Sequence, residues 1–189
     1  MFKDLVTKSR SYRRFDETKR ISSEQLREFV ELARLTPSGG NLQPLRFITV
    51  SDEAKCAEVF PTLMWAAYLK EWKGPAEGER PTGYVIILAP AGQNRGVEEG
   101  ICGQTMMLAA AEQGIGGCFF GSIIRKELAK VIEIPEGYEV KYILALGYPT
   151  EEVVIDEISI GDDIKYYRDE QDVHHVPKIK TDEILVAEY

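Results

Sequence analysis

The residues with the clearest chemical potential form a basic cluster near the start of the chain. Residues 8–20 contain six lysines or arginines, although the formal net charge of the whole chain is -8. Such a local excess of positive charge in an acidic protein indicates an anionic ligand. The planar forks of Arg10 and Arg13 suit a phosphate, and the Ser11 hydroxyl can bond a phosphate oxygen or a ligand hydroxyl. The alternative is a solvated basic arm.

A second polar segment occupies residues 37–44, with the sequence Pro-Ser-Gly-Gly-Asn-Leu-Gln-Pro. Its glycines permit a sharp backbone turn. Asn41 and Gln43 each carry donor and acceptor atoms, which suit the edge of a heterocycle or a row of hydroxyls. The alternative is an ordinary loop between a helix and a strand.

A third segment, residues 114–122, is rich in glycine but is not a dinucleotide-binding fingerprint. That motif needs a glycine where Phe119 stands, and its glycines open a helix, whereas these follow one. Because neighbouring residues on a strand point to opposite faces, we expect at least one of Phe119 and Phe120 to pack in the core.

The elements that must position these segments alternate along the chain. Ser22 and Gln25 form a capping-box pattern before an apolar stripe, and Pro37 ends the helix that follows. Helices are expected at 22–35, 52–60, 97–113 and 125–132, and strands at 45–50, 84–88, 116–120 and 139–146. Residues 150–189 are charged and lack a clear period. The class is therefore α+β or α/β with a mixed sheet.

The composition limits the functional classes. A chain of 189 residues is most simply one domain, residues 1–189. A pI near 5.0 argues against nucleic acid as a partner. The sequence has no long apolar run and no apolar leader, and its three cysteines form no CxxC pair, so we expect a cytoplasmic protein without a membrane span. We expect residues 174–175 (His-His) to lie at a surface or an interface and not to bind metal. The acidic pairs at 98–99, 151–152 and 162–163 are expected to be solvated.

Together these segments resemble the nitroreductase family of FMN-dependent NAD(P)H oxidoreductases. The family opens with Arg-Arg-Ser-x-Arg, and here Ser9 stands at the first arginine, followed by Arg10, Ser11 and Arg13. Residues 37–44 match the flavin loop between the first long helix and the first strand. Residues 114–122 match the strand after the central helix, and residues 176–180 (Val-Pro-Lys-Ile-Lys) match a basic pair near the C-terminus.

The resemblance implies an α+β nitroreductase fold with a mixed central sheet flanked by helices. It also implies an intertwined homodimer, in which the tail (about 150–189) wraps the partner and FMN lies at the interface. FMN carries the chemistry, so no catalytic side chain and no metal are expected; NAD(P)H donates hydride, and a small acceptor is reduced in a ping-pong reaction. The cofactor-binding residues implied are Arg10, Ser11, Arg13, Pro37, Ser38, Gly39, Asn41, Gln43, Phe119, Phe120, Gly121, Ser122, Arg168, Lys178 and Lys180.

Two other interpretations stay open. The family includes flavin-dependent reductive dehalogenases and an oxygen-dependent flavin-cleaving branch, and residues 72–82 could form the substrate lid that such enzymes often have. The chain could also be a flavin-binding module without turnover. The serine at position 9 and the absence of an obvious nicotinamide motif leave room for that reading.

Overall fold

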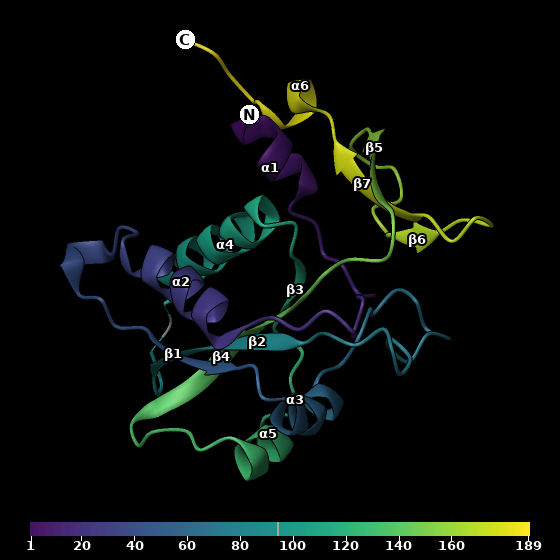
Figure 1. The fold of residues 1–189 in the computed structure, drawn as a ribbon. Helices are drawn as coiled ribbons and strands as arrows, with labels where there is room; N and C mark the ends of the chain where they lie inside the picture. Colours follow the sequence, from purple (N-terminus) through teal and green to yellow (C-terminus); the bar gives the residue numbers. More distant parts are fainter. Residues whose placement is uncertain (94) are drawn as a thin grey trace. The chain divides into compact units, whose positions relative to one another are not determined.

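The computed structural model describes residues 1–93 and 95–189 (Figure 1). The chain forms two compact units: residues 1–65 with 74–150, and residues 66–73 with 151–189. The single domain expected over residues 1–189 stays a prediction. Among the described residues, no helix is long and apolar enough to cross a membrane.

The first unit is built on a four-stranded antiparallel sheet. Its strands lie in the order β1 (Arg46–Val50), β2 (Gly83–Pro90), β4 (Tyr138–Gly147) and β3 (Gly116–Phe120). The central strand β2 is buried along almost its whole length, which explains its continuous apolar run. We expected parallel and antiparallel pairs in one central sheet; here all three pairs are antiparallel.

Helices cover both faces of this sheet (Figure 1). On one face, α2 (Ser23–Arg34) and α4 (Gly96–Glu112) enclose a core with alternate side chains of β2 and β4. On the other, α3 (Glu53–Val59) and α5 (Arg125–Val131) enclose a second core with the intervening side chains. This layered arrangement confirms the α+β class.

The start of α2 confirms the capping box predicted from the sequence. The Ser22 hydroxyl accepts the backbone N–H of Gln25 at 3.2 Å, and the Gln25 side chain accepts the N–H of Ser22 at 3.0 Å. A first helix, α1 (Phe2–Lys8), was not predicted; it is only seven residues long and buries none of them. Two short 3-10 turns, at Gly39–Asn41 and Phe60–Thr62, complete this unit.

The second unit contains strands where the sequence predicted none. Here β5 (Val153–Ile158) pairs in parallel with β7 (His174–Ile179), and β6 (Tyr167–Arg168) pairs antiparallel with β7. A short helix, α6 (Thr181–Ile184), follows. The parallel pairing expected in the central sheet thus occurs in this smaller one.

Three expectations of solvated polar residues were wrong. Glu98 and Glu99 on α4 are only 9% and 3% exposed. The Glu151 side chain is 2% exposed and pairs with the Arg168 guanidinium at 2.8 Å. His174, expected at a surface or interface, is completely buried. Charge along the sequence did not reveal these positions, because burial here is set by tertiary packing.

Candidate functional site

The basic cluster runs as extended backbone along the edge strand β3. Ser11 forms a parallel bridge with Gly117, and the Tyr12 N–H donates to the Gly117 carbonyl at 2.9 Å. Gly116 permits this approach, because a Cβ there would lie 2.5 Å from the Tyr12 ring. Arg13 is only 8% exposed, and its guanidinium donates to the Ser11 carbonyl at 3.2 Å. A solvated arm is therefore wrong for Arg13.

The same cluster holds polar atoms that a phosphate would satisfy. The Arg10 guanidinium donates one bond to the Val6 carbonyl, at 2.7 Å. Its Nε atom and the Ser9 hydroxyl are buried and have no hydrogen-bond partner among the residues that the structure describes. Both can donate, and phosphate oxygens accept. Unsatisfied buried donors are costly, so their presence here fits a site for an anionic group.

The loop at residues 37–44 has a strained backbone. Gly40, Asn41 and Gln43 all lie in the left-handed region, with φ of 57°, 54° and 48°. For a non-glycine residue this conformation costs about 1–2 kcal/mol. The Ser38 hydroxyl stabilises the turn by accepting the Gln43 N–H at 3.1 Å. Strain of this kind gathers at ligand-binding loops, where the surrounding structure maintains it.

Two charged side chains hold the loop from outside. The Gly39 N–H donates to the Glu98 carboxylate at 3.3 Å. The Arg46 guanidinium donates to the carbonyls of Gln43 and Leu45, at 3.1 and 2.7 Å. The burial of Glu98 thus has a structural role, because it ties the start of α4 to the loop.

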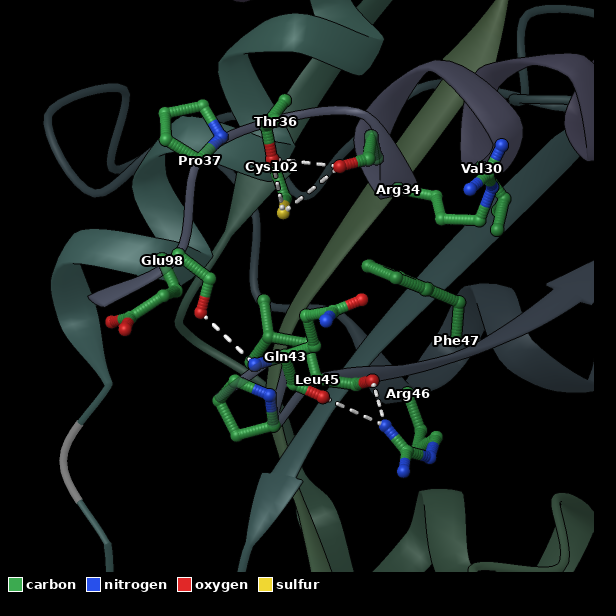
Figure 2. A pocket seen from close by; sticks show the side chains of 13 residues that line it. Val30, Arg34, Thr36, Pro37, Gln43, Leu45, Arg46, Phe47, Glu98 and Cys102 are labelled. Atoms are coloured by element: carbon green, nitrogen blue, oxygen red, sulfur yellow. Dashed lines mark hydrogen bonds between the residues drawn. The ribbon is translucent and has the colours of Figure 1, made fainter. Parts of the chain in front are cut away.

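A cavity of about 330 Å³ lies beside this loop (Figure 2). That volume is at the lower end of the range typical of small-molecule sites. The lining comes from α2, the loop, β1 and the start of α4: Val30, Ala33, Arg34, Thr36, Pro37, Ser38, Gln43, Pro44, Leu45, Arg46, Phe47, Glu98 and Cys102. The cavity is thus an apolar hollow bordered by a few polar groups, three of them charged.

One lining residue, Cys102, is not a candidate nucleophile. Its thiol lies 3.3 Å from the Thr36 hydroxyl and 3.6 Å from the Ala33 carbonyl. Burial raises the pKa of this thiol above 9.0, so it is neutral near pH 7. Cys102 therefore behaves as a small buried side chain, as the sequence predicted for it and for Cys118.

The four residues predicted at the end of β3, residues 119–122, have different surroundings. Phe120 is 4% exposed and packs in the core against Trp65, with ring centres 4.7 Å apart. Phe119 points to the opposite face, where it packs against Tyr142, also at 4.7 Å. Gly121 and Ser122 are exposed. Phe120 thus has a clear packing role, Phe119 is half-buried against the other core, and of the four residues only Gly121 and Ser122 are exposed.

A single chain does not bring the two predicted binding segments together. The loop leads into β1 and the basic cluster pairs with β3, and these are the opposite edges of the sheet. Three strand spacings separate the edges, or about 14 Å. The loop also contacts Glu98 near the start of α4, whereas α1 lies by Ala111 and Glu112 at the end of that helix.

In the second unit, the three predicted basic residues differ in their surroundings. Arg168 is engaged within the unit: it pairs with Glu151 at 2.8 Å and Asp172 at 3.8 Å, and it lies 4.6 Å from the Trp72 ring centre. Lys178 and Lys180 are exposed and two residues apart on an extended segment, so they share a face. Within residues 1–93 and 95–189, no group of three or more His, Cys, Asp or Glu could hold a metal.

Comparisons with known proteins show which sequences and folds this chain resembles. The chain is 24% identical over 177 residues to Protein DrgA of Synechocystis, covering 79% of this chain and 84% of the relative. It is 25% identical over 166 residues to the iodotyrosine deiodinase of Thermotoga neapolitana, covering 79% and 89%. The FMN-dependent nitroreductase NfnB of Mycobacterium smegmatis, solved in complex with NADPH, shares the fold. Its TM-score is 0.62 at 19% identity, covering 78% of this chain and 87% of NfnB.

The family model described as "Nitroreductase family" matches residues 6–148. The matched region runs from the basic cluster to the end of β4, so it contains both edge segments and the cavity. The chain therefore belongs to the nitroreductase family.

Proposed function

We propose that the protein is an FMN-dependent oxidoreductase that takes hydride from NAD(P)H and passes the electrons to a nitroaromatic, a quinone or a similar small acceptor. The observation that carries this proposal is the buried Arg13 beside the unsatisfied donors of Ser9 and Arg10, in a chain of this family. The NfnB structure, which is described as FMN-dependent and contains NADPH, supports the choice of cofactor and donor.

In this proposal the residues of this chain bind and orient the cofactor, and none of them acts as an acid or a base. Bound FMN supplies the ring that accepts and donates hydride. Arg10, Arg13 and Ser11 would hold its phosphate and neighbouring hydroxyls with charge-assisted bonds. The strained loop would present the Asn41 and Gln43 amides to the ring or to the hydroxyl chain. We assign no catalytic side chain, and Gly121 and Ser122 would offer backbone groups to the flavin.

The site is proposed to be complete only in a homodimer. The loop and the basic cluster lie at opposite edges of the sheet, so a second copy would bring one segment to the other. Large apolar side chains around the loop support a subunit contact: Leu35 and Leu42 are both 63% exposed, and Val97 is 73% exposed. The tail, residues 150–189, is proposed to wrap the partner. Dilution should release FMN together with dimer dissociation, and a flavin-loaded monomer would contradict this.

Arg13→Ala tests the phosphate clamp. Loss of a charge-assisted phosphate bond should weaken FMN binding by about 1.5–3 kcal/mol, roughly 10–150-fold. Arg13→Lys keeps the charge but loses the planar fork, so its affinity should be intermediate. Arg27→Ala removes an exposed cation from α2 and serves as the control. Equilibrium dialysis measures all three, and an unchanged affinity in Arg13→Ala would locate the clamp elsewhere.

Reductive dehalogenation is the second candidate, because one relative is an iodotyrosine deiodinase. The lid suggested for residues 72–82 has little support in the part that belongs to the first unit. There the Glu17 carboxylate accepts the backbone N–H groups of Gly78 and Arg80, at 2.6 and 3.3 Å. Release of iodide from iodotyrosine with reduced enzyme would favour this candidate, and reduction of a quinone alone would favour the first. A cytoplasmic location is proposed, because the three cysteines are buried and form no disulfide.

A further inference from the structure

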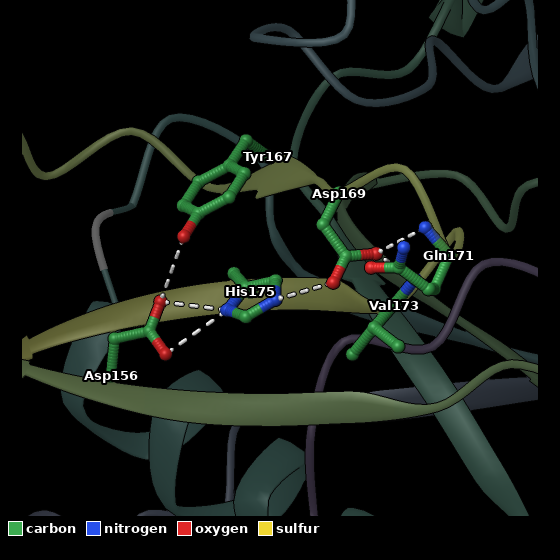
Figure 3. Close-up of polar contacts among 6 residues, drawn as sticks. All are labelled: Asp156, Tyr167, Asp169, Gln171, Val173 and His175. Carbon is green, nitrogen blue, oxygen red and sulfur yellow. Dashed lines mark hydrogen bonds and ion pairs between the residues drawn. The ribbon is translucent and has the colours of Figure 1, made fainter.

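His175 on β7 lies between two carboxylates in the second unit (Figure 3). Its Nδ1 atom lies 3.0 and 2.9 Å from the two oxygens of Asp156, and its Nε2 atom lies 3.2 Å from Asp169. A neutral imidazole carries one N–H, whereas the protonated ring carries one on each nitrogen. Only the protonated ring can therefore donate to both carboxylates at once.

Each carboxylate belongs to a different segment of the unit. Asp156 lies on β5 and is also within 3.4 Å of the Tyr167 hydroxyl. Asp169 follows β6 and accepts the backbone N–H groups of Gln171 and Val173, at 3.0 and 2.8 Å. His175 thus links β7 to β5 and to the turn that connects β6 with β7.

The ring of His175 also stacks on a strand neighbour. The Tyr167 ring on β6 lies parallel to it, with an interplanar angle of 6° and ring centres 4.7 Å apart. An aromatic face attracts a cation, so this stacking favours the protonated imidazole as well. Three separate contacts therefore select the same charged form.

We propose that His175 is a positioning residue, which holds β7 against β5 and β6 and thereby fixes the backbone that carries Lys178 and Lys180. The two lysines lie on the opposite face of the strand from His175, because side chains alternate. Substitution of His175 therefore leaves them chemically intact. The consequence for FMN rests on the proposed function and on the family resemblance, which implies that these lysines are cofactor-binding residues.

The titration of the cluster sets the pH range in which the strand is held. The titratable groups that face His175 are Asp156 from β5, Tyr167 from β6 and Asp169 from the turn. Hydrogen bonds to Asp156 and then Asp169 raise the His175 pKa above 6.5. Stabilisation from a raised histidine pKa is complete below 6.5 and is lost as pH rises through the folded pKa.

Asp169 sets the acidic limit of the same range. Burial acts to raise its pKa, but hydrogen bonds from the Val173 N–H and the His175 ring outweigh burial and hold it below 3.8. Its contribution is present above 3.8 and is lost as pH falls through the folded pKa. The strand is thus held best between the two folded pKa values.

Hydrogen exchange of residues 174–179 in the FMN-free full-length protein tests the proposal. After correction for intrinsic exchange rates, protection in the wild type should fall severalfold between pH 6 and pH 9. His175→Gln should have low protection at both pH values. Glu170→Gln removes an exposed neighbouring carboxylate and should behave like the wild type.

The chain has two histidines, so ring-proton NMR of Asp156→Asn can also detect a lowered His175 pKa. Wild-type protection in His175→Gln at pH 6 would overturn the proposal.

FMN affinity separates the claim that His175 holds β7 from the claim that this contact affects FMN binding through the lysines. All variants are compared at the same pH, so that the FMN phosphate has the same charge in every measurement. His175→Gln should weaken binding about as much as Lys178→Ala combined with Lys180→Ala. Loss of β7 protection with unchanged FMN affinity would overturn the link between His175 and the lysines. Failure of every variant and of the wild type to bind FMN would contradict the proposed function, while hydrogen exchange would still decide the role of His175.

Discussion

Replacing Gly103 with alanine should destabilise the first unit through a single contact. A Cβ at Gly103 would lie 2.0 Å from Cε2 of Phe119 and 2.9 Å from Cζ, whereas ordinary contacts begin near 3.4 Å. The Phe119 ring must therefore move by more than 1 Å. Overpacking of this kind costs about 1–3 kcal/mol, and alanine gains about 1 kcal/mol over glycine inside a helix. The expected net loss is about 1 kcal/mol, or a Tm lower by roughly 2–4 °C.

The sign of this effect should reverse when Phe119 is removed. In a Phe119→Ala background the clash is absent, so Gly103→Ala should raise stability by about 1 kcal/mol. Gly100→Ala, whose Cβ meets no atom within 4 Å, calibrates the helix-propensity gain alone. Urea unfolding of the four FMN-free proteins at one protein concentration measures the cycle. If Gly103→Ala changed the free energy of unfolding equally in the wild type and in Phe119→Ala, Phe119 would not be the residue with which the new Cβ clashes.

Two further predictions concern strain and buried charge. Asn41→Gly relieves a left-handed φ of 54°, so it should raise the free energy of unfolding by about 0.5 kcal/mol while weakening FMN binding; unchanged affinity would remove Asn41 from the site. Burial raises the pKa of Glu99 above 4.5, so its contribution to stability should fall as pH rises from 4.5 through the folded pKa. Glu99→Gln should raise Tm at pH 7 and remove that fall, whereas Glu112→Gln, at an exposed carboxylate on the same helix, should change neither.

Local sequence signals predicted most elements of the first unit. The Ser22 and Gln25 capping box and the apolar stripe after it gave α2, and Pro37 gave its end. The apolar run at 84–88 gave the core of β2. These features depend on neighbours a few residues apart, and so they are visible in one sequence.

The tail could not be predicted in the same way. Strand β5 pairs in parallel with β7, and β7 begins 16 residues after β5 ends, so neither strand has a local partner that a turn motif would reveal. The short β6 depends on the same pairing. The burial of Arg168 against Glu151 also comes from this sheet and from no pattern in the sequence.

The sequence identified the segments of the candidate site but did not predict how the fold arranges them. The basic cluster and the loop at 37–44 were identified by residue type; the cluster is extended backbone beside β3, and the loop contains left-handed residues. Their separation to opposite edges of the sheet follows from strand order, which is a property of the whole fold. Glu98 was missed, although its hydrogen bond to Gly39 holds the loop, because an acidic pair in sequence is usually solvated.

The visible spectrum of the dialysed protein, followed anaerobically while NADH or NADPH is added, tests the central claim most directly. A flavin oxidoreductase should be yellow and should bleach, and the faster donor identifies the preferred nicotinamide. A yellow protein that neither donor bleaches would contradict the proposed enzyme and favour a flavin-binding module. A colourless protein that also fails to take up added FMN would contradict the proposed cofactor itself.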